Sequence, residues 1–404
     1  MAKGTEAAAR VTSDGDGVRW REVAAFVGIT FGLTWLLDLF VWLMVGLDSP
    51  SVYLLLQLQM LIPGSVAIFL GTFFFPESRI HIRRVLGRAR GFLVFFLVFA
   101  MAYVLLGLAG VLLPGMVPLF NLVGVALAAL GLLMVLLLRA FKGRESFARA
   151  GLAGGKVKPW LLFALGLVLF YALQTLLNYL FNMGQRPDLT LAARQSGLRP
   201  EALIALSFAQ SSLLGPFLGL LFAFGEEYGW RGYLQGELVK LGRIRGILLV
   251  GLIWGIWHAP IILMGYNYPG YPLAGTVAMV FYSTGLAFVL GYAVLKTGSI
   301  WLAAYLHALN NQVYSFLVAT VYTPLDPLFS FGLGIYGIAV LALVVAVILR
   351  DPVWRGPGSA PAVLEEKAVE EVKAVKEVEE EEDDPWAKVD WASMREEDDE
   401  AKDR

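Results

Sequence analysis

The chain has 404 residues, of which 58% are hydrophobic and 16% are charged, and its mean hydropathy is +0.67. Soluble proteins carry about 25% charged residues, so this composition excludes an ordinary water-exposed surface and predicts an all-α polytopic membrane protein. The chain contains no cysteine, which excludes disulfides, a thiolate nucleophile and cysteine-ligated zinc.

The formal net charge of −1 conceals an uneven distribution along the chain. Residues 361–404 hold 18 acidic and 7 basic side chains, a net charge of −11, so residues 1–360 carry +10. The polar N-terminal segment, residues 1–23, has no short apolar core followed by a small-residue cleavage site, so a signal peptide is not expected.

Apolar stretches of about 20 residues predict membrane-spanning helices, and we place ten of them in this chain. They lie at residues 24–46, 53–75, 92–113, 118–138, 160–182, 203–224, 246–265, 275–295, 299–320 and 329–349. No internal repeat is visible, so the inverted-repeat architecture of many transporters is not predicted.

Loop charge predicts the orientation of these segments. Arg and Lys cluster in every second loop, whereas the intervening loops 48–52, 114–117, 266–274 and 321–328 contain none. Only the intervening loop 183–202 departs from this alternation, with three arginines. Because cytoplasmic loops are enriched in basic residues, we expect a multi-pass integral membrane protein with both termini cytoplasmic.

The run EEYGWRGYL, which starts at Glu226, places three ionisable groups at the end of an apolar segment. Such groups are costly at membrane depth and mark functional sites. Glu227 and Arg231 are four residues apart and can pair on one helix face, whereas Glu226 points about 100° away. Glu226 is therefore a candidate general base for water. The alternative is a salt-bridge network just outside the membrane.

Two of the three histidines lie in further apolar segments, each four positions from a polar or aromatic residue. Trp254 precedes His258, and His307 precedes Asn311. A single membrane histidine is usually a packed, hydrogen-bonded residue, but two histidines together with an acidic pair favour catalysis. His258 could share a water with Glu226, while His307 and Asn311 could donate hydrogen bonds to an oxyanion.

Glu226, His258 and His307 can lie close together only in certain arrangements of the helices. At 1.5 Å per residue, His258 lies ~18 Å and His307 ~12 Å past the cytoplasmic start of their helices, whereas Glu226 lies near the cytoplasmic end of its own. The three can meet only if helices tilt, if they break near Pro216 or Pro260, or if the Glu226 segment continues past residue 226.

The three motifs in this order resemble one known family, the prenyl-protein (CAAX) endopeptidases and bacterial CPBP proteins, also called the ABI family. The matching residues are Glu226-Glu227-x-x-x-Arg231, Trp254-x-x-x-His258 and His307-x-x-x-Asn311, within roughly residues 203–320. The resemblance implies a helical intramembrane protease with a cavity that opens to the cytoplasmic side and the bilayer. Trp254 departs from the phenylalanine that the family usually has.

The resemblance also implies roles for the residues. Glu226 and His258 would activate water, His307 and Asn311 would stabilise the tetrahedral intermediate, and Glu227, Arg231 and Trp254 would support them. A zinc ion held by Glu226, His258 and His307 is chemically conceivable. Because the HExxH motif is absent and the Glu/His mechanism needs no metal, we favour no metal and no other cofactor.

The chain then divides into five segments: polar residues 1–23, helices and a loop at 24–202, a protease-like core at 203–320, a last helix at 321–350 and an acidic, disordered cytoplasmic tail at 351–404. The expected partners are the lipid bilayer and a membrane-bound peptide or lipidated protein, with no nucleic acid. The oligomeric state is left open.

Two alternative functions remain at this point. Asp38 lies in the first apolar segment without a basic partner in sequence, which would suit an ion-coupled transporter. A non-catalytic immunity or scaffold protein could keep the same fold. Gln174 and Asn178 favour hydrogen bonds between helices, and His81, in an arginine-rich loop, is predicted at the membrane interface.

Overall fold

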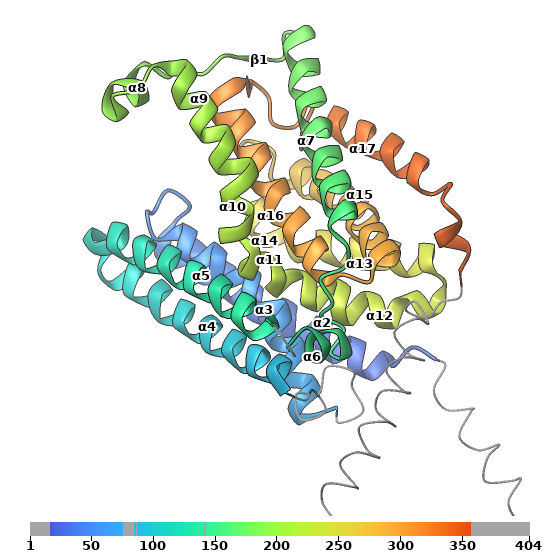
Figure 1. Cartoon of the computed structure of the whole chain (residues 1–404). Coiled ribbons are helices and arrows are strands. Elements are labelled where there is room, and N and C mark those ends of the chain that lie inside the picture. Colours follow the sequence, from blue (N-terminus) through green and yellow to red (C-terminus); the bar gives the residue numbers. More distant parts are fainter. Residues whose placement is uncertain (1–16, 76–84, 86, 141–142, 357–404) are drawn as a thin grey trace, which may run out of the picture. The chain divides into compact units, whose positions relative to one another are not determined.

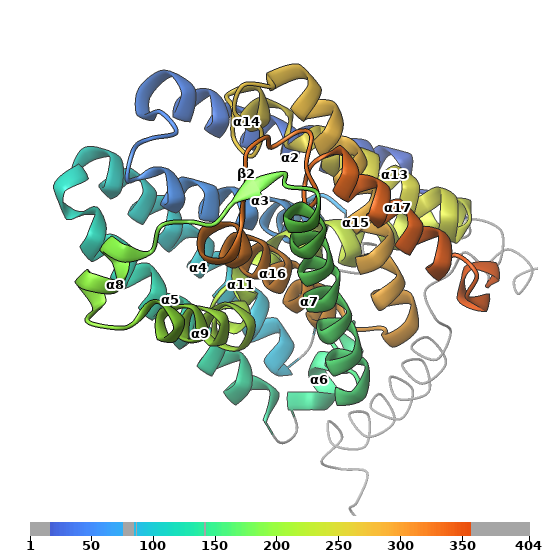
Figure 2. The ribbon, with the colours of Figure 1, turned by 90° about the horizontal axis from the view of Figure 1, so that it is seen from above.

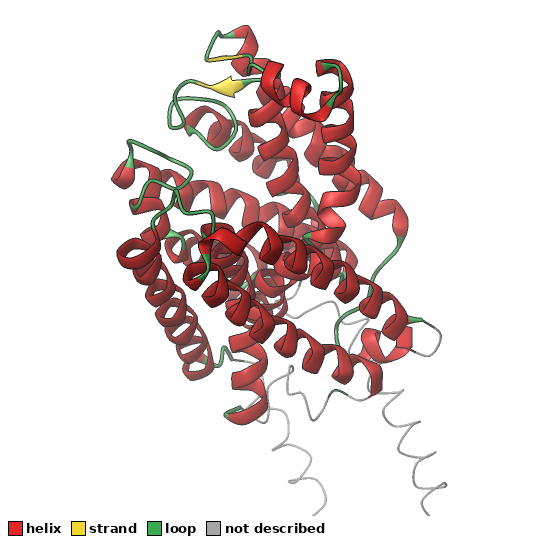
Figure 3. Cartoon of the chain, turned by 90° about the vertical axis from the view of Figure 1, so that its left-hand side faces the viewer, coloured by secondary structure: helices red, strands yellow, loops and turns green. Residues whose placement is uncertain are grey.

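A computed structural model of the chain describes residues 17–75, 85, 87–140 and 143–356. These residues are almost entirely helical, as Figure 3 shows by colour, and the two short strands among them form one antiparallel pair. The all-α architecture predicted from composition is therefore confirmed. His81 and the acidic residues from 357 onward lie outside the described residues, so the predictions about them are not tested here.

Four long helices lie among the described residues between 17 and 140 (Figure 1). They are α2 (Trp20–Phe40), which a π-helical turn extends through Val41–Val45, α3 (Val52–Phe73), α4 (Gly87–Leu112) and α5 (Val117–Arg139), which follows a 3₁₀ turn at Pro114–Met116. Among these, α3 is the inner helix, because 61% of its most apolar stretch is buried, against 22–33% for the other three.

The middle of the chain contains α6 (Gly143–Arg149), α7 (Val157–Leu180), strand β1 (Gly184–Gln185) and α8 (Thr190–Ser196). A nearly continuous helical run then extends from Pro200 to Leu241. It comprises α9 (Pro200–Ala209), a π-helical turn (Gln210–Leu214), α10 (Gly215–Leu218), α11 (Leu220–Glu227), a second π-helical turn (Tyr228–Leu234), α12 (Gln235–Leu238) and a 3₁₀ turn (Val239–Leu241).

This run changes the expected position of Glu226. The predicted segment ends at residue 224, but the helix continues past Glu226 and changes direction between α10 and α12 (Figure 1). Glu226 therefore lies inside the helical run, with helical residues on both sides, which is one of the conditions for the three motifs to meet.

The C-terminal part carries the histidine motifs. It contains α13 (Arg243–Trp257), α14 (Ala259–Leu263), α15 (Pro272–Thr297), α16 (Ile300–Phe316) with a π-helical turn (Leu317–Val321), strand β2 (Thr323–Pro324), α17 (Ile335–Ile348) and a 3₁₀ turn (Pro352–Arg355). Seen from above, α16 lies among α7, α11 and α15 (Figure 2), and it contacts all three.

Each of the ten predicted segments contains a helix, although 329–349 becomes helical only at Ile335, and fewer than ten reach spanning length. Within the described residues, seven stretches are long and apolar enough to cross a membrane: Trp20–Val45, α3, α4, Pro114–Arg139, α7, Pro200–Leu218 and α15. The other three, α13, α16 and α17, have 15, 17 and 14 residues. The end of α13 has a local cause, because Pro260 lacks the N–H that would continue the helical hydrogen bonds.

Glycines bring α11 against α3, which packs alongside it. A Cβ atom added at Gly225 would lie 2.5 Å from the carbonyl oxygen of Met60, and one at Gly229 would lie 2.6 Å from the ring of Pro63. Real Cβ atoms do not approach so closely, so the two backbones touch where no side chain fits. This contact fixes the position of the residue next to Gly225, which is Glu226.

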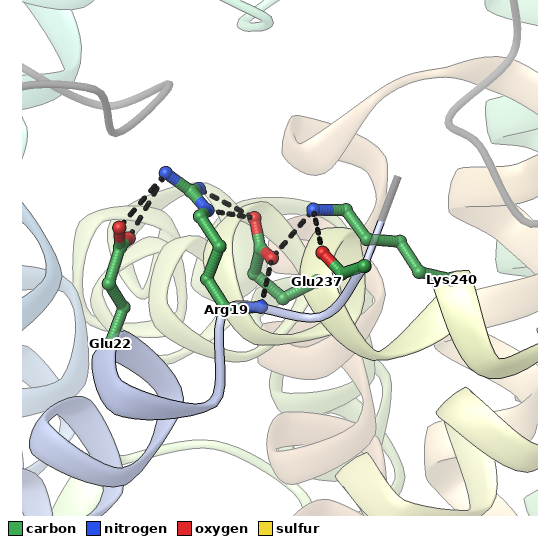
Figure 4. A network of polar contacts seen from close by, with 5 residues as sticks. Arg19, Glu22, Glu237 and Lys240 are labelled. Atoms are coloured by element: carbon green, nitrogen blue, oxygen red, sulfur yellow. Dashed lines mark hydrogen bonds and ion pairs between the residues drawn. The ribbon is translucent and has the colours of Figure 1, made fainter. Parts of the chain in front are cut away.

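Charged side chains join the start of α2 to α12 (Figure 4). Glu237 accepts hydrogen bonds from Arg19 Nη2 at 2.6 Å and from Lys240 Nζ at 2.8 Å, and Arg19 also pairs with Glu22. Burial raises the pKa of Glu237, but the hydrogen bonds from Arg19 and Lys240 outweigh it and hold that pKa below its ordinary value. The helix α2 begins at Trp20, four residues before the predicted span.

Candidate active site

A cavity of about 210 Å³ lies between α3, α11, α13, α15 and α16, large enough for several water molecules. Glu226, Trp254, His258, His307 and Asn311 all line it. The cavity wall also contains Gln59, Tyr282, Ser283, Asn310, Tyr314 and Ser315, which the sequence interpretation did not single out as site residues. The structure thus brings the three separated motifs to one polar cavity.

Glu226 is buried in α11 and has two unlike oxygens. Its Oε2 accepts a hydrogen bond of 2.8 Å from the indole Nε1 of Trp254. Its Oε1 lies 3.9 Å from His307 Nε2, too far for a direct hydrogen bond. One oxygen of this carboxylate is therefore held in place, while the other can accept a hydrogen bond from a molecule in the cavity.

Glu227 and Arg231 form the ion pair that their spacing predicts. Arg231 Nη1 donates to Glu227 Oε1 at 2.9 Å, and both side chains are fully buried. The same oxygen accepts a hydrogen bond of 2.8 Å from His307 Nδ1. Because α11 and α16 are adjacent, Glu227 links the arginine of one motif to the histidine of another.

The two histidines present the same nitrogen to the cavity. His258 lies at the end of α13, and its Nδ1 donates a hydrogen bond of 2.8 Å to the carbonyl oxygen of Trp254. The carbonyl can only accept, so this bond leaves Nε2 as the remaining ring nitrogen. His307 uses Nδ1 on Glu227 in the same way, and its Nε2 is directed toward Glu226.

Trp254 joins these groups in a way that sequence could not show. Its indole N–H holds Glu226, and its ring lies 4.4 Å from the guanidinium of Arg231, a cation–π contact. The same ring packs against His258 and His307, with centroid distances of 5.7 and 5.4 Å. A phenylalanine at this position could not make the bond to Glu226.

Asn311 faces the cavity, but its direct partner in the protein is a neighbour in sequence. Its Oδ1 accepts a hydrogen bond of 3.1 Å from Asn310 Nδ2. Asn310 in turn lies against the hydroxyl groups of Tyr171 and Tyr282. The sequence gives little signal for this network, because single polar groups in apolar helices do not reveal their partners.

Asp38 is buried and paired after all, with a residue of α3. Gln59 Nε2 lies 3.2 Å from Asp38 Oδ1 and 3.4 Å from Oδ2, and Gln59 also lines the cavity. Gln174 and Asn178 bond to the backbone of the loop before α17, at Gly332 and Phe331, instead of to another helix as expected. This correction follows from the loop's position beside α7.

The metal alternative requires Glu226, His258 and His307 to converge on one point. In the part of the chain that the structure describes, no three His, Asp or Glu side chains are grouped so that they could hold a metal ion. Metal-free hydrolysis and the zinc alternative both stay predictions at this point.

Fold and site together define a class of protein, a polytopic membrane protein with a buried Glu/His/Asn cavity. Residues 208–313 match the family described as type II CAAX prenyl endopeptidase, Rce1-like. The matched segment contains α11, α13, α14, α15 and most of α16, with all three motifs.

A curated relative gives a shorter match. CAAX prenyl protease 2 of Methanococcus maripaludis is 40% identical over 53 residues, which are 13% of this chain and 20% of the relative. The chain thus spans about a fifth of the length of that relative. No solved structure matches the chain significantly.

Proposed function

We propose that this protein is an intramembrane endopeptidase that hydrolyses a peptide bond in a membrane-associated substrate. The observation that carries the proposal is the single cavity that Glu226, His258, His307 and Asn311 line together. The family match of residues 208–313 supports it independently.

In the proposed reaction, Glu226 Oε1 and His258 Nε2 accept hydrogen bonds from one water molecule. The water oxygen attacks the peptide carbonyl carbon as its proton passes to Glu226. The C–N bond then breaks, and Glu226 returns that proton to the leaving amine nitrogen. One peptide becomes a carboxylic acid and an amine, so atoms and protons balance.

The tetrahedral intermediate carries an oxyanion that needs hydrogen-bond donors. In this proposal His307 acts as an imidazolium, with Nδ1–H donated to Glu227 and Nε2–H to the oxyanion. The Asn311 amide N–H is the second donor. Glu227 and Arg231 hold His307 in place, and Trp254 holds Glu226. No step uses a metal, and reversible loss of cleavage on zinc chelation would contradict this part of the mechanism.

The proposed substrate is a membrane-bound peptide or a lipidated, prenylated protein, which reaches the cavity from the cytoplasmic side. Basic loops on the proposed cytoplasmic side support that orientation. The chain has no cysteine, so single cysteines placed in the loops 48–52 and 321–328 can be labelled with a membrane-impermeant maleimide. Labelling of either from the cytoplasmic side would contradict the orientation.

The test of the function is cleavage of prenylated and unprenylated reporter peptides in proteoliposomes. Glu226→Ala, His258→Ala and His307→Ala are each expected to abolish cleavage while the protein remains folded by thermal melting. Unchanged turnover in the Glu226 variant would exclude this mechanism.

The same assay separates the alternative functions. Asp38→Asn is expected to preserve cleavage, because Asp38 reaches the cavity only through Gln59. An ion-coupled transporter would instead lose its function in Asp38→Asn and keep it in Glu226→Gln. A non-catalytic scaffold would tolerate both Glu226→Ala and His258→Ala.

A further inference from the structure

Three buried side chains that the proposed reaction does not yet use, Tyr171, Tyr282 and Asn310, form a chain of hydrogen bonds that ends at Asn311. The hydroxyls of Tyr171 and Tyr282 lie 2.6 Å apart. Both lie within reach of Asn310 Oδ1, at 2.6 and 3.0 Å, and Asn310 Nδ2 lies 3.1 Å from Asn311 Oδ1. Tyr171, Tyr282 and Asn310 are at most 5% exposed.

Counting donors and acceptors fixes the direction of this chain. Each tyrosine brings one O–H, and Asn310 Oδ1 can accept from Tyr171 while Tyr282 donates either to it or to Tyr171. If the Asn310 amide were turned over, its NH₂ would face the two hydroxyls. One tyrosine O–H would then lose its protein acceptor, which is costly for a buried donor. The two tyrosines therefore favour the arrangement with Oδ1 toward them.

The orientation of the Asn310 amide also sets that of the Asn311 amide. With Oδ1 of Asn310 on the tyrosines, its Nδ2 donates to Asn311 Oδ1. That bond occupies the Asn311 carbonyl and leaves the Asn311 NH₂ for the cavity, where an oxyanion requires a donor. Turning both amides over would present a carbonyl oxygen to the oxyanion, which repels it.

We propose that Tyr171, Tyr282 and Asn310 are positioning residues that orient the Asn311 amide so that its N–H groups face the reacting carbonyl. This inference rests on the proposed function. Tyr171 comes from α7, outside the segment 208–313 that matches the family. The N-terminal half thus contributes to the orientation of a site residue that the matched segment carries.

The chain of hydrogen bonds lies in a wall between two cavities. Tyr282 and Asn310 line the polar cavity and also a second, apolar cavity of about 290 Å³ between α7, α15, α16 and α17. Of these two cavities, Tyr171 lines the apolar one. The lining of the second cavity is apolar and offers few hydrogen-bond acceptors. The tyrosine hydroxyls therefore find their acceptors among Tyr171, Tyr282 and Asn310 themselves.

The test compares kcat and KM for peptide cleavage in proteoliposomes. The double variant Tyr171→Phe/Tyr282→Phe removes both hydroxyls and keeps the rings. Because loss of one oxyanion donor lowers kcat by about 10²–10³-fold, we expect the double variant to approach the lower figure with KM changed less than about 2-fold. In an Asn311→Ala background the same double substitution should change kcat less than about 2-fold, since both act through one amide.

The control is Tyr268→Phe, which removes another fully buried hydroxyl, one that donates to the backbone of Leu333 at 2.6 Å. It should lower the melting temperature and leave kcat unchanged. Full kcat in the double tyrosine variant, or an undiminished further loss in the Asn311→Ala background, would overturn the inference. If the wild-type protein cleaves no peptide, the proposed function fails first, and a second readout is needed.

That readout is the side-chain ¹⁵N–¹H amide resonances of Asn310 and Asn311 in nanodiscs, which report the hydrogen bonds without turnover. We expect both to shift in the double tyrosine variant and to stay in place in Tyr268→Phe. Resonances unchanged by loss of both hydroxyls would overturn the inference independently of any activity.

Discussion

Individual residues at the cavity depend on partners from other helices. Trp254 is the clearest case, because it lies on α13, donates to Glu226 on α11 and packs against His307 on α16. The bond fixes Glu226 Oε2, so that Oε1 is the oxygen available to water. An aromatic ring alone would fill the space without this effect.

Replacing Trp254 by phenylalanine tests that bond. A hydrogen bond to a charged group contributes about 1.5–3 kcal/mol, so we expect Trp254→Phe to lower kcat/KM for cleavage by about 10-fold or more. Trp301→Phe is the matched control, because Trp301 is buried and donates its indole N–H to the carbonyl of Leu152, away from the cavity. Cleavage by Trp254→Phe at the wild-type rate would show that its bond to Glu226 has no catalytic role.

Sequence spacing predicted the residue contacts that lie within one helix. Four-residue separation is sufficient for the Glu227–Arg231 pair, because the two side chains project from the same helix face about one turn apart. It could not predict the Trp254–Glu226 bond or the Tyr171–Asn310 bond, which join residues 28 and 139 positions apart. Those contacts depend on how helices lie against one another.

At the scale of elements, the helical run from Pro200 to Leu241 decides where the acidic motif lies. Its polar residues suggested the end of a membrane span, but they are buried and the helix continues past them. Sequence could not distinguish a motif buried within the fold from one in a loop at the end of a span, because the same residues can form an ionic cluster in either place. The contact between α3 and α11 places the motif inside the fold.

That contact gives a prediction for glycine. We expect Gly225→Ala to lower the melting temperature and to reduce cleavage, because the new Cβ would collide with the backbone of Met60 and displace Glu226. Gly236→Ala in α12 is the control, since no atom lies within 4 Å of its Cβ position and alanine favours the helix. Equal melting temperatures and rates for the two variants would contradict the packing argument.

Across the whole molecule, Arg19 at the start of α2 is paired by charge with Glu237 of α12. Glu237 has a lowered pKa in the folded protein, so its contribution to stability is present above its unfolded pKa, near 4.5, and is lost as the pH falls through the lower folded value. We expect Glu237→Gln to melt earlier than wild type at pH 7, and the difference to shrink below pH 4.5. Glu201→Gln, at an exposed position, is the control. A difference that grows on acidification would contradict this assignment.

The acidic tail gives a second prediction at this scale. Within the part of the chain that the structure describes, the side chains that line the polar cavity lie between residues 56 and 333. These described side chains supply the whole proposed reaction, so we expect deletion of residues 361–404 to leave the rate of peptide cleavage unchanged in proteoliposomes. A loss of cleavage, with melting temperature preserved, would mean that the tail takes part in substrate capture.

The sequence alone determined the class of protein and singled out its candidate site residues. Long apolar segments predict helices, because within a bilayer the backbone must form its hydrogen bonds internally. Ionisable residues in such segments are rare and mark candidate sites. Only the tertiary structure decided that Glu226, His258, His307 and Asn311 share one cavity, that Trp254 holds Glu226, and that Tyr171 reaches Asn310. The physical reason is the sequence separation of the contacts. Helical spacing determines which side chains within one helix are neighbours. Contacts between helices depend instead on packing, on helix breaks and on the close approach of backbones at glycines.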